Sequence, residues 1–186
     1  GLAFTAKGRL SSAAEELRGL EAIAADQSLK DFRVTFSRNG AQAILEIAVE
    51  VLAGEMAAGQ KNYAEAIARL HRAVLLEDNL IYNEPPDWHV PARQSLGAVL
   101  LTAGRAAEAE SIYWQDLQRN TENGWSLFGL MMSLRAQEKG EQARAVEKRF
   151  RKAWNQADVR LTASRFMDAT RTAVASSRTG SSDLSP

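Results

Sequence analysis

Apolar residues recur at helical spacing through most of this chain, in one helix-length stretch after another. Recurrence every three or four residues places them on one face of an α-helix. The alternation that would indicate a strand occurs in one short stretch, DFRVTFS, within residues 26–41. Alanine is the most frequent residue, and Leu, Glu, Arg, Gln and Met supply much of the rest; all lose little rotamer freedom in a helix. The pattern predicts an all-α fold.

Two stretches, residues 49–74 and 93–117, align with each other without a gap. Each carries a glycine, an alanine twelve residues later and a large side chain four residues beyond that: Gly54, Ala66 and Leu70 in the first, Gly97, Ala109 and Tyr113 in the second. A small residue lets a second helix approach closely, and the large side chain fills the adjacent space. The pattern predicts antiparallel helix pairs, with turns at Gly59 and Gly104, where glycine allows a left-handed cap.

Two further copies of this pattern are less regular. Residues 122–150 contain a third copy, in which Gly129 and Ala145 are sixteen residues apart, and residues 7–26 contain a half copy. The first helix of the half copy is mostly missing, and the chain begins with Gly1 rather than Met. We therefore expect the sequence to be part of a longer protein.

The copies resemble the tetratricopeptide repeat (TPR), a helix pair of about 34 residues with Leu-Gly in its first helix and Ala, a large residue and Ala in its second. The stretch GWSLFGL, with Trp125, Phe128 and Gly129, resembles the Trp-x-x-Leu-Gly opening of that repeat. Asp116 departs from it by replacing a small residue. More narrowly, the run from EDNLIYNEPPDWHVPARQSLG to LTASRF is similar to the C-terminal part of long, uncharacterised bacterial proteins of this family. The resemblance implies a right-handed TPR solenoid of antiparallel helix pairs, with about three and a half units plus a C-terminal helix.

The resemblance also divides the chain into three parts. Residues 1–42 form a partial N-terminal repeat and a linker, residues 43–157 form three TPR-like units, and residues 158–186 form a capping segment and a flexible tail. In the linker, Phe32, Val34 and Phe36 are expected to dock on neighbouring helices. In the last part, residues 164–175 are expected to form a helix that covers the end of the solenoid.

An inserted loop at residues 81–89 interrupts the repeat. Gly54 and Gly97 are 43 residues apart, about nine more than the usual period, and the surplus contains two prolines, Tyr82 and Trp88. In one interpretation, the two aromatic residues anchor a binding partner, as Tyr and Trp do at interface hot spots. In the other, which we favour, the prolines hold an extended path and Trp88 packs between units as a staple.

Composition and charge narrow the function classes. The 23 Lys and Arg balance the 23 Asp and Glu, so no net charge attracts a polyanion, and we predict no nucleic-acid partner. The sequence contains no run of about 18 apolar residues, which is the length that would predict a membrane span. The absence of Cys removes disulfides and thiolate zinc sites and fits a reducing compartment. The cytoplasm is the default expectation, and the periplasm stays open because a leading segment is expected to be missing.

Signatures of catalysis are absent from the sequence. It contains no phosphate-binding P-loop, no G-x-S-x-G nucleophile turn and no dinucleotide-binding glycine pattern. The spacing of His71 and His89, with Asp87 nearby, matches no zinc motif. We predict no enzyme activity, no cofactor and no metal site.

Basic residues crowd into one predicted helix: Arg144, Lys148, Arg149, Arg151 and Lys152. A phosphate-binding strip is one interpretation of this cluster. The interpretation that we favour is a solvated outer face whose long side chains cover Phe150 and Trp154.

In the TPR family, the first helix of each unit lines a concave groove. Alignment on the glycines assigns to this groove Glu55, Gln94, Leu101, Ser126 and Leu130. Some family members clamp a C-terminal carboxylate with Lys, Asn and Arg, and the matching positions here hold Val51, Glu55, Ser95, Asn123 and Leu127. We therefore predict no carboxylate clamp.

The sequence thus favours a non-catalytic scaffold that binds a peptide, a protein segment or a neighbouring domain in its groove. The missing N-terminal part of its own chain is one candidate partner. The alternative hypothesis is an accessory C-terminal region of a larger enzyme or metal-dependent protein whose active residues lie upstream.

Overall fold

The computed structural model describes residues 1–33 and 37–165, and all regular elements of these residues are helical. The elements are α1 (Leu2–Ala6), α2 (Leu10–Ala24), the short 3-10 helix η1 (Gln27–Leu29), α3 (Ala41–Gly59), α4 (Tyr63–Asp78), α5 (Ala92–Thr102), α6 (Ala106–Arg119), α7 (Gly124–Ala136) and α8 (Gly140–Ala153). A single antiparallel bridge joins Arg33 and Gly40 within the described part of the chain. The prediction of an all-α fold is confirmed.

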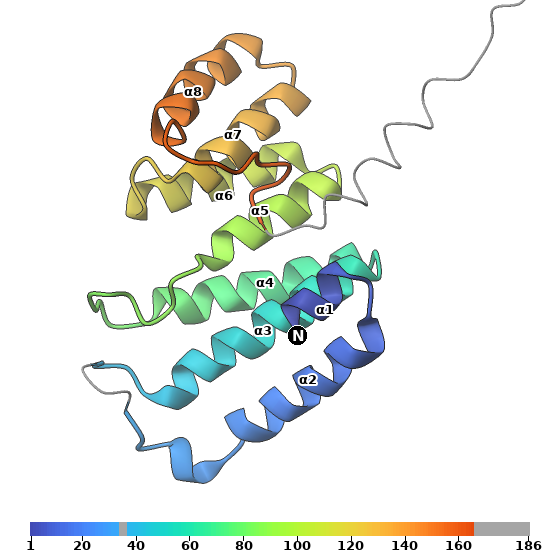
Figure 1. Ribbon diagram of the computed structural model, residues 1–186, viewed down its shortest axis with the longest axis vertical. Helices are drawn as coiled ribbons and strands as arrows, with labels where there is room; N and C mark the ends of the chain where they lie inside the picture. The colour runs from blue at the N-terminus through green and yellow to red at the C-terminus, as the bar shows by residue number, and fades with distance from the viewer. Residues whose placement is uncertain (34–36, 166–186) are drawn as a thin grey trace, which may run out of the picture.

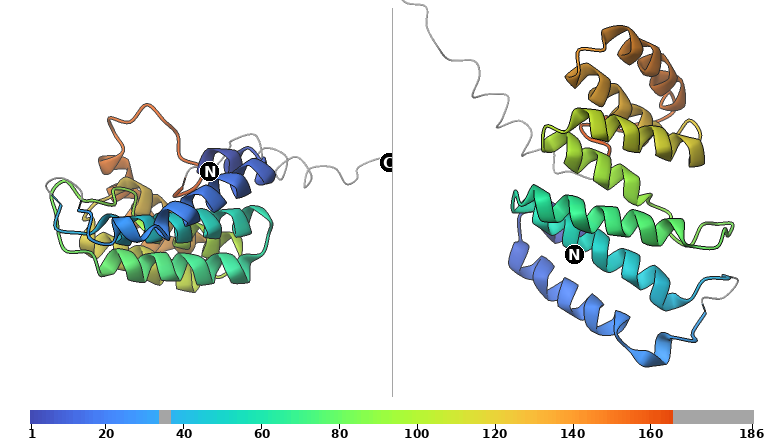
Figure 2. Two further views of the ribbon diagram at one scale, coloured as in Figure 1. Left: turned by 90° about the horizontal axis from the view of Figure 1, so that it is seen from below. Right: turned by 180° about the vertical axis from the view of Figure 1, so that it is seen from behind.

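The helices stack in chain order along the long axis of the molecule (Figure 1). From α2 to α8 each helix contacts the next one, and α3 also contacts α5, which in turn contacts α7. Figure 2 shows α1 and the chain that follows α8 on one side of the stack and α4 on the other. The side formed by α3, α5 and α7 is therefore the side on which the two ends of the described chain lie.

One apolar core runs continuously from α3 to α8. It includes Ile47, Leu70, Leu96, Tyr113 and Leu130, all fully buried. A second, smaller core of Ala13, Leu52 and Met56 joins α1 and α2 to α3. Burial of apolar area drives this stacking, because each helix hides its apolar face against both neighbours.

Glycines permit the close helix contacts, as the sequence predicts. A Cβ added at Gly54 would lie 2.7 Å from Cγ of Leu70, and one added at Gly97 would lie 2.7 Å from Cε1 of Tyr113. Gly129 of α7 faces the same tyrosine. The Tyr113 ring, which projects from α6, is therefore held between α5 and α7, and it links two successive helix pairs.

Helix ends follow the prediction at one glycine and not at the other. Gly104 adopts the expected left-handed conformation, with φ of 78°. The prediction for Gly59 is wrong, because α3 continues through this residue and Lys61 takes the left-handed conformation instead, with φ of 63°. The side chain of Asn62 accepts a hydrogen bond from the amide of Glu65 and so begins α4, which places the turn just before Asn62.

Two further expectations concern the linker before α3 and the C-terminal segment. The prediction that Phe32 docks on neighbouring helices is wrong, because it is 57% exposed. The same prediction for Val34 and Phe36 falls outside the described residues. The C-terminal helix expected at residues 164–175 falls mostly outside the described residues. Ser164 and Arg165, which are described, are not helical.

Candidate functional site

Residues 155–165, named the strap here, leave α8 and return across the stack toward α5 (Figure 1). The turn begins at Trp154, whose ring stacks on Phe150 and meets Trp125 edge to face, with centroid distances of 5.9 and 5.7 Å. Trp154 Nε1 donates a hydrogen bond of 2.8 Å to the carbonyl of Val159. An aromatic cluster at the end of α8 thus directs the strap back along the side of α3, α5 and α7.

Ser164 fixes the end of the strap to α5 and α6. Its hydroxyl donates to the carbonyl of Gln94 at 3.1 Å and lies 2.5 Å from the hydroxyl of Tyr113. Because the single hydroxyl hydrogen of Ser164 goes to Gln94, Tyr113 is the donor in the second bond. Both hydroxyls are buried, and burial raises the pKa of Tyr113 above its ordinary value, so this phenol stays protonated.

Arg165 joins the strap to α3 through an ion pair with Glu55. The two side chains retain only 10% and 12% of their exposure, so both charges are largely removed from water. Buried charges of this kind are tolerated when they are paired, and removal of one partner leaves the other uncompensated. Glu55 is therefore specific for a positive charge at this position.

The predicted groove residues separate into two groups. Glu55 and Gln94 contact the strap, and together with Tyr113 they form what is named the strap site here. Ser126 and Leu130 are fully buried, and Leu101 is partly buried against the same core. These last three side chains pack inside the stack and offer a partner little or no surface.

Sequence reasoning missed three members of this site: Tyr113, Ser164 and Arg165. Tyr113 was expected to pack between helices, which it does, but its hydroxyl has a second role. The sequence pattern predicts a helical cap at Ser164 and Arg165, which the structure shows to be non-helical. The pair of Arg165 and Glu55 spans 110 residues of sequence, and no local pattern signals such a contact.

The inserted loop is tied to the linker that precedes α3. The side chain of Asn39 donates to the carbonyl of Ile81 and accepts from its amide, at 2.7 and 2.8 Å. The carboxylate of Asp87 accepts from Ser37 and Asn39, both at 2.7 Å. The hydrogen bond from Ser37 is the main reason why the pKa of Asp87 is lowered. These bonds hold the loop and the linker as one unit.

The two aromatic residues of the loop lie in different environments. Trp88 is half-buried and packs against the main core. Tyr82 is 79% exposed, and its hydroxyl donates to Glu84 at 2.6 Å. The position of Trp88 is that expected of a staple between units, whereas Tyr82 is free to meet solvent.

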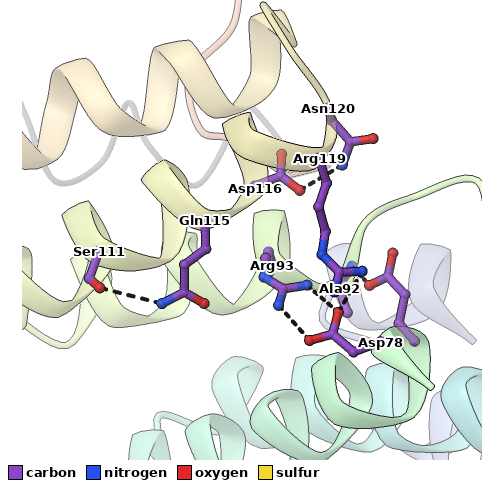
Figure 3. Close-up of polar contacts among 9 residues, drawn as sticks. Asp78, Ala92, Arg93, Ser111, Gln115, Asp116, Arg119 and Asn120 are labelled. Atoms are coloured by element: carbon purple, nitrogen blue, oxygen red, sulfur yellow. Dashed lines mark hydrogen bonds and ion pairs between the residues drawn. The ribbon is translucent and has the colours of Figure 1, made fainter.

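A cluster of charges around the buried Arg93 joins α4, α5 and α6 (Figure 3). Arg93 binds both carboxylate oxygens of Asp78, at 2.7 and 2.6 Å, and Arg119 lies 3.0 Å from the same carboxylate. The hydrogen bonds from Arg93 hold the pKa of Asp78 below its ordinary value. Two-point binding of this kind orients the helices as well as pairing the charges.

Glu77 lies beside this cluster and accepts a hydrogen bond of 2.9 Å from the amide of Ala92 at the start of α5. Burial raises the pKa of Glu77 to about 7, and the nearby carboxylates of Asp116 and Asp78 act in the same direction. The hydrogen bond from Ala92 and the charge of Arg93 oppose this rise. Glu77 therefore titrates near neutral pH.

Asp116, which replaces a small residue of the repeat pattern, is buried and hydrogen-bonded to neighbouring side chains. It accepts a hydrogen bond of 2.9 Å from the side-chain amide of Asn120 (Figure 3) and another from the hydroxyl of Ser126. The bond from Ser126 joins α6 to α7, whereas the bond from Asn120 lies at the end of α6 itself. The bond to Asp116 explains why Ser126, a predicted groove residue, points into the stack.

The basic helix, α8, pairs several of its charges with carboxylates. Arg149 binds Glu122 through two nitrogens, at 3.0 and 2.6 Å, and its guanidinium lies 5.7 Å from the ring centre of Trp114. Arg151 binds Glu147 at 2.7 Å. This arrangement is typical of a solvated outer face.

The described residues contain neither a metal-binding cluster nor a membrane-spanning helix. No group of three or more His, Asp or Glu residues is placed to hold a metal ion in residues 1–33 and 37–165. In the same residues, no helix combines the length and the apolar character needed to cross a membrane. Comparison of the chain with protein-family models, curated proteins and solved structures finds no match. The resemblance to tetratricopeptide repeats therefore stays a prediction.

Proposed function

We propose that this chain is a non-catalytic protein-interaction scaffold, built from TPR-like helix pairs, that holds an extended segment of a partner protein on the side formed by α3, α5 and α7. Binding consists of burial of the segment against a preformed helical surface, with a few polar contacts that set its register. No chemical step is assigned to the chain.

The helix arrangement supports this proposal. Successive antiparallel helices pack through glycine contacts at Gly54, Gly97 and Gly129. Each pair contacts the next along one axis, so the first helices of the pairs lie on a common side. An extended stack of this kind presents a long surface, which suits a peptide better than a small molecule.

The observation that carries the proposal is the strap itself. Residues 161–165 are not helical, yet they lie against α3, α5 and α6 with Leu161 and Ser164 buried. Their contacts include a carbonyl of the helix, a tyrosine hydroxyl and a carboxylate. This side of the stack therefore offers the groups needed to hold a non-helical segment.

A peptide selection with mapped binding tests the proposal. The wild-type chain and the Arg165→Ala variant are each screened against a random peptide library, and enriched peptides are mapped by amide hydrogen exchange. We expect enriched peptides to protect amides of α3 and α5. The Glu141→Gln variant is the control, because this side chain is exposed at the start of α8 and should not affect binding. Enrichment of no peptide, or protection confined to other helices, refutes the proposal.

A further inference from the structure

We infer that the strap site recognises an extended segment in which a small hydroxyl residue directly precedes arginine, and that the chain's own Ser164 and Arg165 occupy this site as an internal ligand. The inference rests on the proposed function and specifies its ligand. A partner segment of the same chemistry would have to displace the strap.

The hydroxyl requirement follows from the surroundings of Ser164. Its oxygen donates to a main-chain carbonyl and accepts from Tyr113, so both of its hydrogen-bonding roles are used. The Tyr113 ring cannot move aside, because Gly97 and Gly129 pack against it from both sides. An alanine in place of Ser164 would leave the Tyr113 hydroxyl and the Gln94 carbonyl buried without this partner.

The requirement for arginine follows from Glu55. This carboxylate is largely buried, and Arg165 is its ion-pair partner among the described residues. A buried carboxylate discriminates strongly against a neutral or acidic ligand residue, because an uncompensated charge would remain out of water. Arg165 reaches this carboxylate through Nη1.

The strap is suited to displacement because few of its residues are anchored. Residues 155–160 are exposed, and the buried contacts are confined to Leu161, Ser164 and Arg165. The short tether keeps the internal ligand at an effective concentration on the order of millimolar. The affinity of a partner for the wild-type chain is therefore lower than its affinity for the empty strap site.

Fluorescence anisotropy with a labelled peptide of residues 158–165 tests this inference on the full chain. We expect Arg165→Ala in the chain to raise its affinity for the peptide at least about tenfold, because the internal competitor is weakened. Ser164→Ala should also raise the affinity for the peptide, and it leaves Glu55 paired with Arg165. Circular dichroism checks that both variants are folded. Arg160→Ala is the matched control, since this arginine lies on the same strap but is exposed.

Ligand chemistry is tested in the Arg165→Ala background. Glu55→Gln should abolish the gain in affinity, and Glu55→Arg should restore binding to a peptide that carries Glu in place of its final Arg. Tyr113→Phe keeps the ring between the two glycines and should weaken binding of the serine peptide by about two- to tenfold. It should leave unchanged the binding of a peptide with Ala in place of that Ser.

Two results overturn the inference. One is equal binding of the peptides with and without the final arginine, and the other is wild-type affinity equal to that of Arg165→Ala. If the library selection described above still yields peptides that protect α3 and α5, the proposed function survives and only its ligand chemistry is wrong. If that selection yields none at this surface, the proposed function fails as well.

Discussion

Ionisation of Glu77 should destabilise the protein as the pH rises through neutrality. The carboxyl group lies between α4 and α5, close to the carboxylates of Asp78 and Asp116, and it accepts a hydrogen bond from Ala92. Its pKa is raised from 4.5 to about 7, mainly by burial. The folded state therefore binds the proton more tightly than the unfolded state does. The resulting stabilisation is fully present below pH 4.5 and is lost as the pH rises through about 7.

The magnitude follows from the difference between the two pKa values. A tenfold change in proton affinity corresponds to about 1.4 kcal/mol, so the rise from 4.5 to about 7 amounts to about 3 kcal/mol at most. Substitution of Glu77 by Gln keeps an oxygen that can accept from Ala92 and cannot ionise. We expect Glu77→Gln to match the wild type near pH 5 and to exceed it by about 2 to 3 kcal/mol near pH 8.

Urea unfolding followed by circular dichroism, at several pH values between about 5 and 8, measures this difference. The difference between variant and wild type is the quantity to compare, because it removes contributions common to both proteins. Asp78 and Asp87, whose pKa values are lowered from 3.8, lose their stabilising contributions only at more acidic pH, outside this range. Glu141→Gln, at an exposed position, should show no such trend. A difference that stays constant over this range, or that grows toward low pH, would refute the raised pKa of Glu77.

Two further substitutions test how the stack is held together. Gly97→Ala should destabilise the protein by about 1 to 3 kcal/mol, because the added methyl group collides with Tyr113. Gly19→Ala, in open space on α2, should stabilise it by about 0.5 to 1 kcal/mol. Changes of the same sign for both variants in urea unfolding would contradict this view. Trp88→Ala should cost about 2 kcal/mol as a packing residue, whereas Tyr82→Ala should change stability by less than about 0.5 kcal/mol. Equal melting temperatures for these two variants would argue against the staple.

Local patterns in the sequence were sufficient to predict the helix pairs. Gly54 and Leu70, and likewise Gly97 and Tyr113, meet as their spacing predicts. Such contacts depend on two adjacent helices and a short turn, so the relevant residues lie close together in the sequence. The turn after α3 was misplaced at Gly59, because the side chain of Asn62 decides where α4 begins.

The candidate site was predicted only in part. Alignment assigned Glu55 and Gln94 to the groove, and both contact the strap. It also placed Ser126 and Leu130 there, although both are buried, because an alignment assigns a helix position but not what the neighbouring helix covers. Asp116 illustrates the point, since its bond to Ser126 turns that serine inward.

What the sequence determined by itself is the all-helical character of the chain and the order of its helix pairs, since periodicity and small residues act over a single turn or a single crossing. Only the tertiary structure decided what lies on the side of α3, α5 and α7. The strap returns there from beyond α8, and Arg165 meets Glu55 across 110 residues. Such a contact depends on how all the intervening helices pack. The spacing of residues in a short stretch of sequence does not contain this information.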